Sequence, residues 1–204
     1  PIVLRAPSRT APAVIAIGSS TGGPQALFTV LGALPANLTL PILITQHMPP
    51  TFTTILAQHI ARTTNRPAAE AVDGEAVRPG RIYLAPGDFH MRVETSGADR
   101  VLRLSKDPPE NFCRPAVDPM LRSLVAAYNG RILTVILTGM GSDGTKGARF
   151  FNQRKLPVLV QVPHSCVVGG MPQSSPERLI RKTTSLPQLF ARRVHDTPDR
   201  EAYR

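Results

Sequence analysis

The sequence predicts an α/β fold: a doubly wound, mainly parallel sheet with helices on both faces and a small antiparallel hairpin excursion. Three observations support this prediction. Short, wholly apolar runs recur along the chain, as expected of strands buried on both faces. Segments with helical spacing separate these runs, and such alternation is typical of parallel sheets. In the middle of the chain, shorter and partly alternating runs lie between turn residues, which is the pattern of antiparallel strands.

The elements follow in order. The first half predicts strand 13–17, helix 25–31, strand 41–45 and helix 52–62. Pro24 stands at a good first helical position. The middle predicts three short strands of an antiparallel excursion, at 81–84, 90–94 and 101–104, with turn residues between them. The second half predicts helix 116–128, strand 132–137, a helix ending near residue 152, strand 157–162 and a terminal helix at 186–194.

The composition is that of a globular protein. A length of 204 residues suits one domain, and we expect it at residues 13–195, after a linker or leader at 1–12 and before a tail at 196–204. Hydrophobic residues make up 42% of the chain, which is enough for a core and argues against disorder. No apolar run approaches the ~18 residues that span a membrane, and no signal peptide opens the chain, so we expect no membrane insertion.

The charged residues and the cysteines indicate which partners and which compartment to expect. The net charge is +10, which favours an anionic partner, but the arginines are scattered and aromatic residues make up only 5%. We therefore do not expect nucleic-acid binding, which needs focused charge and stacking platforms. Two cysteines, Cys113 and Cys166, cannot form a disulfide scaffold or a structural zinc site, which suggests a reducing cytoplasm.

The first strand ends in a glycine-rich loop that contains a candidate nucleophile. Residues 18–22 match the pattern Gly-x-Ser-x-Gly, with Ser20 at its centre. This pattern places a serine on a tight strand-to-helix turn, where backbone N–H groups can stabilise an oxyanion. A plain helix cap is an equal alternative on this pattern alone. A phosphate-binding loop is less favoured, because the chain lacks the P-loop lysine and the Gly-x-Gly-x-x-Gly spacing.

A candidate base and a candidate carboxylate follow two other strands. His47 lies at the end of the second strand and could reach Ser20 if the two strands are neighbours. His90 is its only serious competitor. Asp143 follows strand 132–137 between glycines and could orient the imidazole, although an ordinary N-cap is the alternative. We interpret Asp88 as a turn residue and Asp118 as a residue near a helix start.

These three side chains converge in the predicted fold. Sites of parallel sheets form beyond the carboxyl ends of the strands, which is where Ser20, His47 and Asp143 all lie. A serine hydrolase needs this combination, although the order Ser, His, Asp differs from that of α/β-hydrolases. Neither Cys113 nor Cys166 has the glycine-rich, helix-start context of a nucleophile, and we interpret both as buried or idle thiols.

Six blocks, in order, resemble the catalytic domain of the chemotaxis protein-glutamate methylesterase family, CheB. They are IGSSTGGP at 17–24, ITQHMPP at 44–50, LAPGDFHM at 84–91, RPAVD at 114–118, ILTGMGSDG at 136–144 and SCVVGGMP at 165–172. The chain departs from the family pattern at 112–113, where Phe and Cys replace basic residues or histidine. It also departs near 154–157, after Gln161 and after Pro172.

The resemblance implies a cytoplasmic serine hydrolase that needs no metal or cofactor. It would remove methyl esters from glutamates of methyl-accepting chemotaxis receptors, releasing methanol, and could also deamidate receptor glutamines. By matching positions, Ser20 would be the nucleophile, His47 the base and acid, and Asp143 the orienting carboxylate. The backbone N–H groups of Thr21 and Met140 would be oxyanion-hole candidates.

The resemblance also implies regulation by a part that this sequence does not show. The family usually carries an N-terminal receiver domain, phosphorylated by a histidine kinase, that covers the active site. Residues 1–12 could then be the end of the linker to that domain. The alternative to an enzyme is an inactive hydrolase-like module that binds acidic receptor helices. A nucleotide-binding Rossmann-like domain is a third interpretation, for which we expect no support.

Overall fold

The computed structural model describes residues 11–153 and 156–175, and within them the predicted sheet is present. Six strands form a sheet in the order β3-β4-β2-β1-β7-β8, and every neighbouring pair is parallel. In chain order these strands are β1 (Val14–Ser19), β2 (Ile42–Gln46), β3 (Ala68–Glu70), β4 (Ile82–Leu84), β7 (Ile132–Ile136) and β8 (Val158–Val160).

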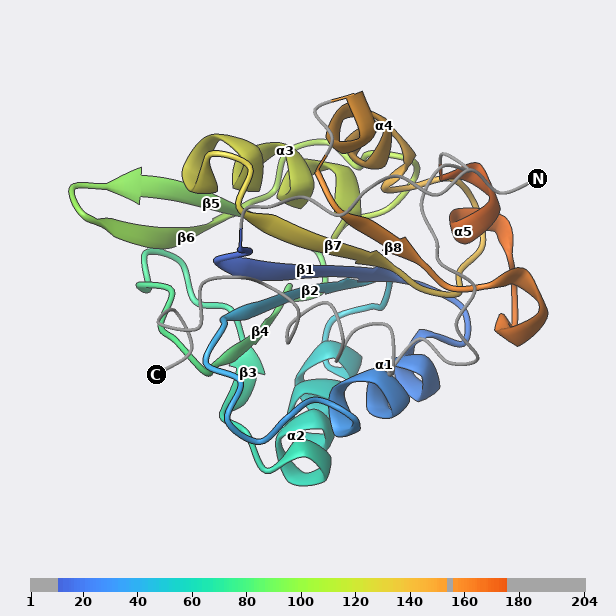
Figure 1. The fold of residues 1–204 in the computed structure, drawn as a ribbon, viewed down its shortest axis with the longest axis horizontal. Helices are drawn as coiled ribbons and strands as arrows, with labels where there is room; N and C mark the ends of the chain where they lie inside the picture. Colours follow the sequence, from blue (N-terminus) through green and yellow to red (C-terminus); the bar gives the residue numbers. More distant parts are fainter. Residues whose placement is uncertain (1–10, 154–155, 176–204) are drawn as a thin grey trace.

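Helices cover both faces of the sheet, as Figure 1 shows. The helices α1 (Gly23–Gly32) and α2 (Phe52–Thr64) lie on one face, and α3 (Val117–Tyr128) and α4 (Thr145–Gln153) lie on the other. A 3-10 turn, Pro163–Ser165, and the short helix α5 (Gly170–Ser174) follow β8. This three-layer arrangement is that of a doubly wound α/β fold.

The two layers of helices explain why the central strands are mostly apolar on both faces. Along β1, Ile15 and Ile17 pack into the core shared with α1 and α2, while Val14 and Ala16 pack into the core shared with α3 and α4. Every residue of β1, β2 and β7 is buried. Successive side chains of a strand point to opposite faces, so a strand covered on both sides has no polar face to show.

The antiparallel excursion is smaller than predicted. It contains two strands, β5 (His90–Ser96) and β6 (Asp99–Ser105), which pair in antiparallel register. The run at 81–84, predicted as a third strand of this excursion, is instead β4 of the main sheet, parallel to β2. Its three residues Ile82, Tyr83 and Leu84 are buried, and this burial on both faces is the mark of a parallel strand. The prediction that residues 81–84 belong to the antiparallel excursion relied on the turn residues around them, and it was therefore wrong.

The other differences between the sequence prediction and the structure concern short elements. The edge strand β3 was not predicted, because three half-buried residues give no clear apolar pattern. Neither the 3-10 turn after β8 nor α5 was predicted, and β8 is shorter than the predicted 157–162. The predicted terminal helix 186–194, most of the linker 1–12 and the tail 196–204 lie outside the described residues.

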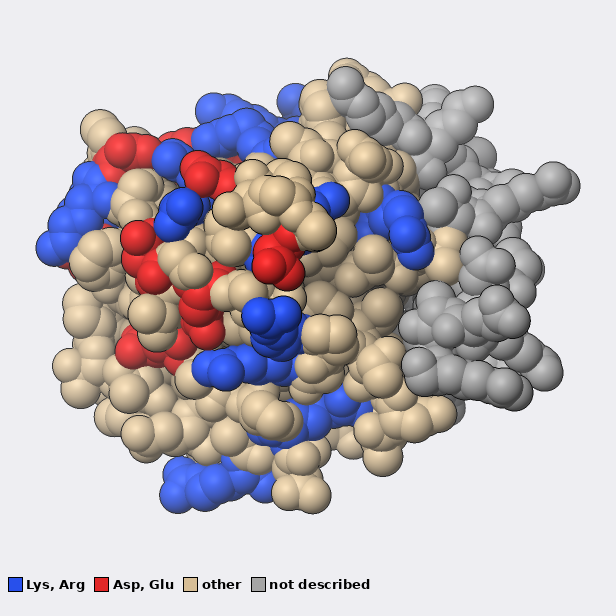
Figure 2. All heavy atoms as spheres, turned by 90° about the vertical axis from the view of Figure 1, so that its left-hand side faces the viewer, with Lys and Arg blue, Asp and Glu red and all other residues tan. Residues whose placement is uncertain are grey.

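Charged residues of both signs are interleaved at the end of the molecule that carries the β5–β6 turn, as Figure 2 shows. Ion pairs from the hairpin and the segment before β4 join Arg78 to Asp99, Arg81 to Glu75, and Arg103 to both Asp73 and Glu94. Most of these side chains are exposed, so each pair contributes little to stability. This face therefore carries no concentrated basic patch, although the net charge of the chain is +10.

The strand order brings three loops to one edge. Strands β2, β1 and β7 are neighbours, with Ser19 paired to Gln46 and Gly18 paired to Ile136. Gly18 allows the start of α3 to approach this edge, because a Cβ there would lie 2.7 Å from Val117. The loops after all three strands, and the N-terminus of α3, therefore meet at one place.

Candidate functional site

Ser20 lies on the sharp turn that the sequence predicts between β1 and α1. Its backbone N–H donates to the carbonyl of Thr138 at 3.0 Å, and its own carbonyl accepts from Gly23 at 2.7 Å. Gly22 is the N-cap of α1 with a left-handed φ of 79°, and no side chain caps this helix. Glycine suits that conformation, and a Cβ there would also lie 2.6 Å from Val167. The side chain of Ser20 is therefore not used as a helix cap.

Gln46 joins the turn at Ser20 to the end of β2. Its buried amide donates to the carbonyl of Ser20 at 2.9 Å and to the carbonyl of His47 at 3.1 Å, and it accepts from Ser19 Oγ at 2.7 Å. The backbone N–H of His47 in turn donates to the carbonyl of Ser19 at 3.0 Å. These bonds fix the distance between the two loops. The sequence analysis did not single out Gln46, although it lies within one of the recognised blocks.

Asp143 lies at the N-terminus of α3 and does not cap its own following helix. Its Oδ2 accepts from Val117 N at 2.6 Å, and its Oδ1 accepts from Asp118 N at 3.2 Å and Gly144 N at 2.8 Å. The first residues of a helix have free N–H groups and a partial positive charge, which suit a carboxylate. The Nδ2 of Asn111 also donates to Oδ1, at 2.8 Å. The carboxylate is thus held rigidly by its neighbours.

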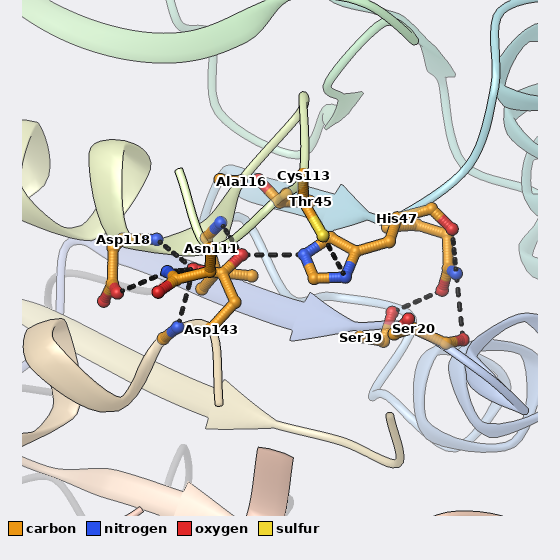
Figure 3. Close-up of polar contacts among 12 residues, drawn as sticks. Ser19, Ser20, Thr45, His47, Asn111, Cys113, Ala116, Asp118 and Asp143 are labelled. Atoms are coloured by element: carbon orange, nitrogen blue, oxygen red, sulfur yellow. Dashed lines mark hydrogen bonds and ion pairs between the residues drawn. The ribbon is translucent and has the colours of Figure 1, made fainter. Parts of the chain in front are cut away.

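The imidazole of His47 contacts Asp143 directly, as Figure 3 shows. Nε2 of His47 lies 2.7 Å from Oδ2 of Asp143, and the two side chains are only 11% and 2% exposed. A carboxylate at Nε2 favours the neutral tautomer that carries its proton there, which leaves the lone pair of Nδ1 free to accept a proton. In the Ser-His-Asp template of proteases the roles of the two nitrogens are exchanged.

The contact changes the pKa of both groups. Burial alone would lower the pKa of His47, but hydrogen bonds to Asp143 and Cys113 and the charge of Asp143 outweigh it, and the pKa rises to about 9. Burial opposes ionisation of Asp143 as well. Hydrogen bonds from His47 and from the N-terminus of α3 nevertheless hold its pKa below the usual range. The pair therefore favours an imidazolium next to a carboxylate.

Ser20 and His47 lie on adjacent loops, but the described residues form no hydrogen bond between Ser20 Oγ and the imidazole. Catalytic hydrogen bonds are often long or misaligned before substrate binds, so this arrangement does not exclude a reaction between them. Nδ1 of His47 instead lies 3.4 Å from Sγ of Cys113. The interpretation of Cys113 as an idle thiol was therefore wrong, because the loop before α3 brings it to the imidazole.

The remaining candidates have other roles. His90 is fully buried, with Nε2 3.1 Å from the carbonyl of Pro108 and Nδ1 accepting from Ala116 N, so both ring nitrogens are engaged. Asp88 has a φ of 67° and binds Arg114, as expected of a turn residue. Asp118 lies in the first turn of α3, as predicted, and accepts from Gly147 N at 2.7 Å.

The two oxyanion-hole candidates lie next to Ser20. Within the described part of the chain, the backbone N–H groups of Thr21 and Met140 donate to no other group. Gly139 packs against the nucleophile: a Cβ there would lie 2.7 Å from the Cβ of Ser20. This close approach requires a glycine and brings the peptide between Gly139 and Met140 to the serine.

Asn111 is a second site residue that the sequence analysis missed. Its amide bridges Asp143 and Asp118, at 2.8 and 3.1 Å. Asn111 and Phe112 have consecutive positive φ angles, 51° and 63°, which non-glycine residues rarely adopt. The signal in the sequence was weak: an asparagine three residues before the RPAVD block, in a loop of no regular pattern.

The described ranges contain neither a metal-binding cluster nor a membrane-spanning helix. Over residues 11–153 and 156–175, no group of three or more His, Cys, Asp and Glu side chains is arranged to hold a metal ion. Over the same residues, the helices are too short or too polar to cross a membrane.

Comparison with known proteins agrees with this geometry. The CheB methylesterase family profile matches residues 15–192. A protein-glutamate methylesterase/protein-glutamine glutaminase of Paramagnetospirillum magneticum is 62% identical over 173 residues, which is 84% of this chain and 45% of the relative. Its counterpart in Rhodospirillum rubrum is 56% identical over 174 residues, with the same coverage of each chain.

A solved structure is similar as well. The crystal structure of the Thermotoga maritima CheB methylesterase catalytic domain matches with a TM-score of 0.77 and 43% identity, over 80% of this chain and 87% of that one. The chain spans less than half the length of the two curated relatives, and nearly all of this catalytic domain. The sequence profile, the curated relatives and the solved structure agree, and the chain belongs to the CheB methylesterase family.

Proposed function

We propose that this chain is a serine-dependent protein-glutamate methylesterase with Ser20 as nucleophile, His47 as base and acid, and Asp143 as orienting carboxylate. The observation that carries this proposal is the meeting of three loops at one edge of the sheet, with Nε2 of His47 2.7 Å from the carboxylate of Asp143. Membership of the family supports the same reaction.

We propose a separate task for each side chain. The reactive form is the neutral fraction of His47, which increases as the pH approaches 9. In this form Asp143 keeps the proton on Nε2, so Nδ1 accepts the proton of Ser20 as Oγ attacks the ester carbonyl. The N–H groups of Thr21 and Met140 would stabilise the oxyanion of the tetrahedral intermediate. Nδ1–H then protonates the departing methoxide, and methanol leaves a glutamyl ester on Ser20. Water, activated by the same nitrogen, releases the glutamate carboxylate and restores the serine.

The substrate we propose is a glutamate methyl ester on a helix of a methyl-accepting chemotaxis receptor. Exposed apolar side chains surround the site: Phe112 precedes Cys113, Met140 follows Gly139, and Val167 packs against Gly22. These side chains suit an amphipathic protein segment better than a small ester. An amide can react by the same steps with loss of ammonia, and the curated relatives are named as glutaminases too. We therefore include deamidation of receptor glutamines.

We further propose that the enzyme acts in the cytoplasm, together with a receiver domain that a histidine kinase phosphorylates. The described cysteines, Cys113 and Cys166, are free thiols, which suits a reducing compartment. The curated relatives are more than twice as long as the region they share with this chain, which leaves room for such a domain in them. The alternative of an inactive receptor-binding module gains no support from the relatives or from the intact Ser20, His47 and Asp143.

The test is methanol release from receptor membranes whose glutamates have been methylated. The chain should release methanol, and folded Ser20→Ala should release none above background. A Cys166→Ala variant serves as the matched control, because the thiol of Cys166 hydrogen-bonds only to the carbonyl groups of Gln161 and Val162 among the described residues. Absence of methanol release from the folded wild-type chain would contradict the proposed function.

A further inference from the structure

The loop before α3 is built to present one thiol to the imidazole. Glu110 and Cys113 exchange two backbone hydrogen bonds, of 3.1 and 2.9 Å. Arg114, the next residue, binds Asp88 and the carbonyl groups of Lys106 and Asp107. Asn111, two residues before the cysteine, is bound to Asp143. The position of Cys113 is therefore fixed from both sides.

The ring nitrogens of His47 leave only one place for the proton of Ser20. Nε2 is engaged by Asp143 at 2.7 Å, and Nδ1 is engaged by Sγ of Cys113 at 3.4 Å. The thiol and the serine hydroxyl therefore compete for the same ring nitrogen. Within the described structure Cys113 contacts this nitrogen, and Ser20 Oγ makes no hydrogen bond to it (Figure 3).

We propose that Cys113 is a positioning residue of the base: its thiol holds Nδ1 of His47 in the resting site and yields it to Ser20 when substrate binds. This inference rests on the proposed function. A thiol sulfur is a weak acceptor, so it can hold the Nδ1–H of the imidazolium and still be displaced by a serine hydroxyl. Asp143 keeps its own bond to Nε2 throughout, so the ring stays in place while Nδ1 changes partner.

The first test is the pH dependence of kcat/KM for methanol release by the 204-residue chain and its Cys113→Ala variant. The titratable groups that contact His47 are Asp143 and Cys113. Asp118 is linked to Asp143 through the amide of Asn111, which donates to both carboxylates. Loss of the acceptor for Nδ1–H should destabilise the imidazolium and move the midpoint of the profile down, by up to about 0.7 pH unit for a hydrogen bond of ordinary strength. An unchanged midpoint with a lower plateau would show a merely structural role and overturn the proposal.

The second test uses the fact that the chain has two cysteines. In Cys166→Ala, methyl methanethiosulfonate converts the thiol of Cys113 into a methyl disulfide and releases methanesulfinate, which needs no other oxidant. The added group would lie next to Nδ1, where Ser20 must deliver its proton, so methanol release should fall more than about tenfold and return with dithiothreitol. The Cys113→Ala/Cys166→Ala double variant should keep its activity through the same treatment.

The outcomes separate the two proposals. Full activity after complete modification of Cys113, confirmed by mass spectrometry, would overturn the positioning role while leaving the methylesterase intact. If Cys166→Ala releases no methanol even before treatment, while it is folded, the proposed function itself fails.

Discussion

Replacing Asp143 with Asn should remove most of the pH dependence that the buried pair gives to stability. The pKa of His47 is about 9 in the folded chain, compared with 6.5 for an ordinary histidine. A folded-state pKa above the unfolded value means that protonation favours folding. The stabilisation is therefore fully present below about pH 6.5, and it is lost as the pH rises through 9.

The magnitude follows from the same shift. A change from 6.5 to about 9 corresponds to about 3 kcal/mol of unfolding free energy. Solvent screening reduces it little, because the side chains of His47 and Asp143 are 11% and 2% exposed. In Asp143→Asn the imidazole stays buried without its carboxylate, so this contribution should disappear. The asparagine carbonyl can still accept from Val117 or Asp118, which should preserve the start of α3.

The assay is urea unfolding followed by circular dichroism at about pH 6 and about pH 10. The difference in unfolding free energy between wild type and Asp143→Asn should be larger at the lower pH by about 3 kcal/mol. Asp88→Asn is the matched control: that carboxylate pairs with Arg114 at the surface, and its pKa lies below the usual range. A difference for Asp143→Asn that is equal at both pH values would refute the reasoning.

Three further predictions follow from the site and the charge. Folded Ser20→Ala and His47→Ala should each lose at least about 10⁴-fold in methanol release, and the double variant should be little worse; a fully additive loss, or a greater loss from His90→Ala, would contradict the roles assigned. Gly139→Ala should slow turnover strongly, because its Cβ would lie 2.7 Å from the Cβ of Ser20. Gly32→Ala, whose Cβ meets nothing within 4 Å, is the control, and equal rates for the two variants would count against the close approach. Since the net charge is +10, the second-order rate on receptor membranes should fall as salt rises past about 0.1 M, and a constant rate would argue against electrostatic encounter.

The sequence was most informative where buried, mostly apolar strands end in loops that carry polar side chains. Strands β1, β2 and β7 are buried throughout and mostly apolar, so their limits could be predicted closely, and with them the loops that carry Ser20, His47 and Asp143. The motif predicted the sharp turn at Ser20 because glycine is needed there for backbone reasons. The run at 81–84 was misplaced because turn residues around it resemble those of a hairpin, whereas its burial depends on neighbours that are distant in sequence.

The surroundings of the site could not be predicted in the same way. Asn111 and Cys113 reach Asp143 and His47 from a loop with two successive left-handed residues, and no periodic pattern encodes such a path. The use of the α3 N-terminus to hold Asp143 depends on the approach of Val117 to Gly18, a contact between residues 99 positions apart in the sequence. Contacts of this kind follow from packing rather than from local propensity.

The measurement that tests the central claim most directly is mapping of an active-site label. A fluorophosphonate reacts with a serine only when a neighbouring base activates it. We expect the label on Ser20 of the wild-type chain, identified by mass spectrometry of its peptides, and labelling at least about 10²-fold slower in folded His47→Ala. A label on another residue, or equally fast labelling of Ser20 without His47, would contradict a serine activated by the imidazole.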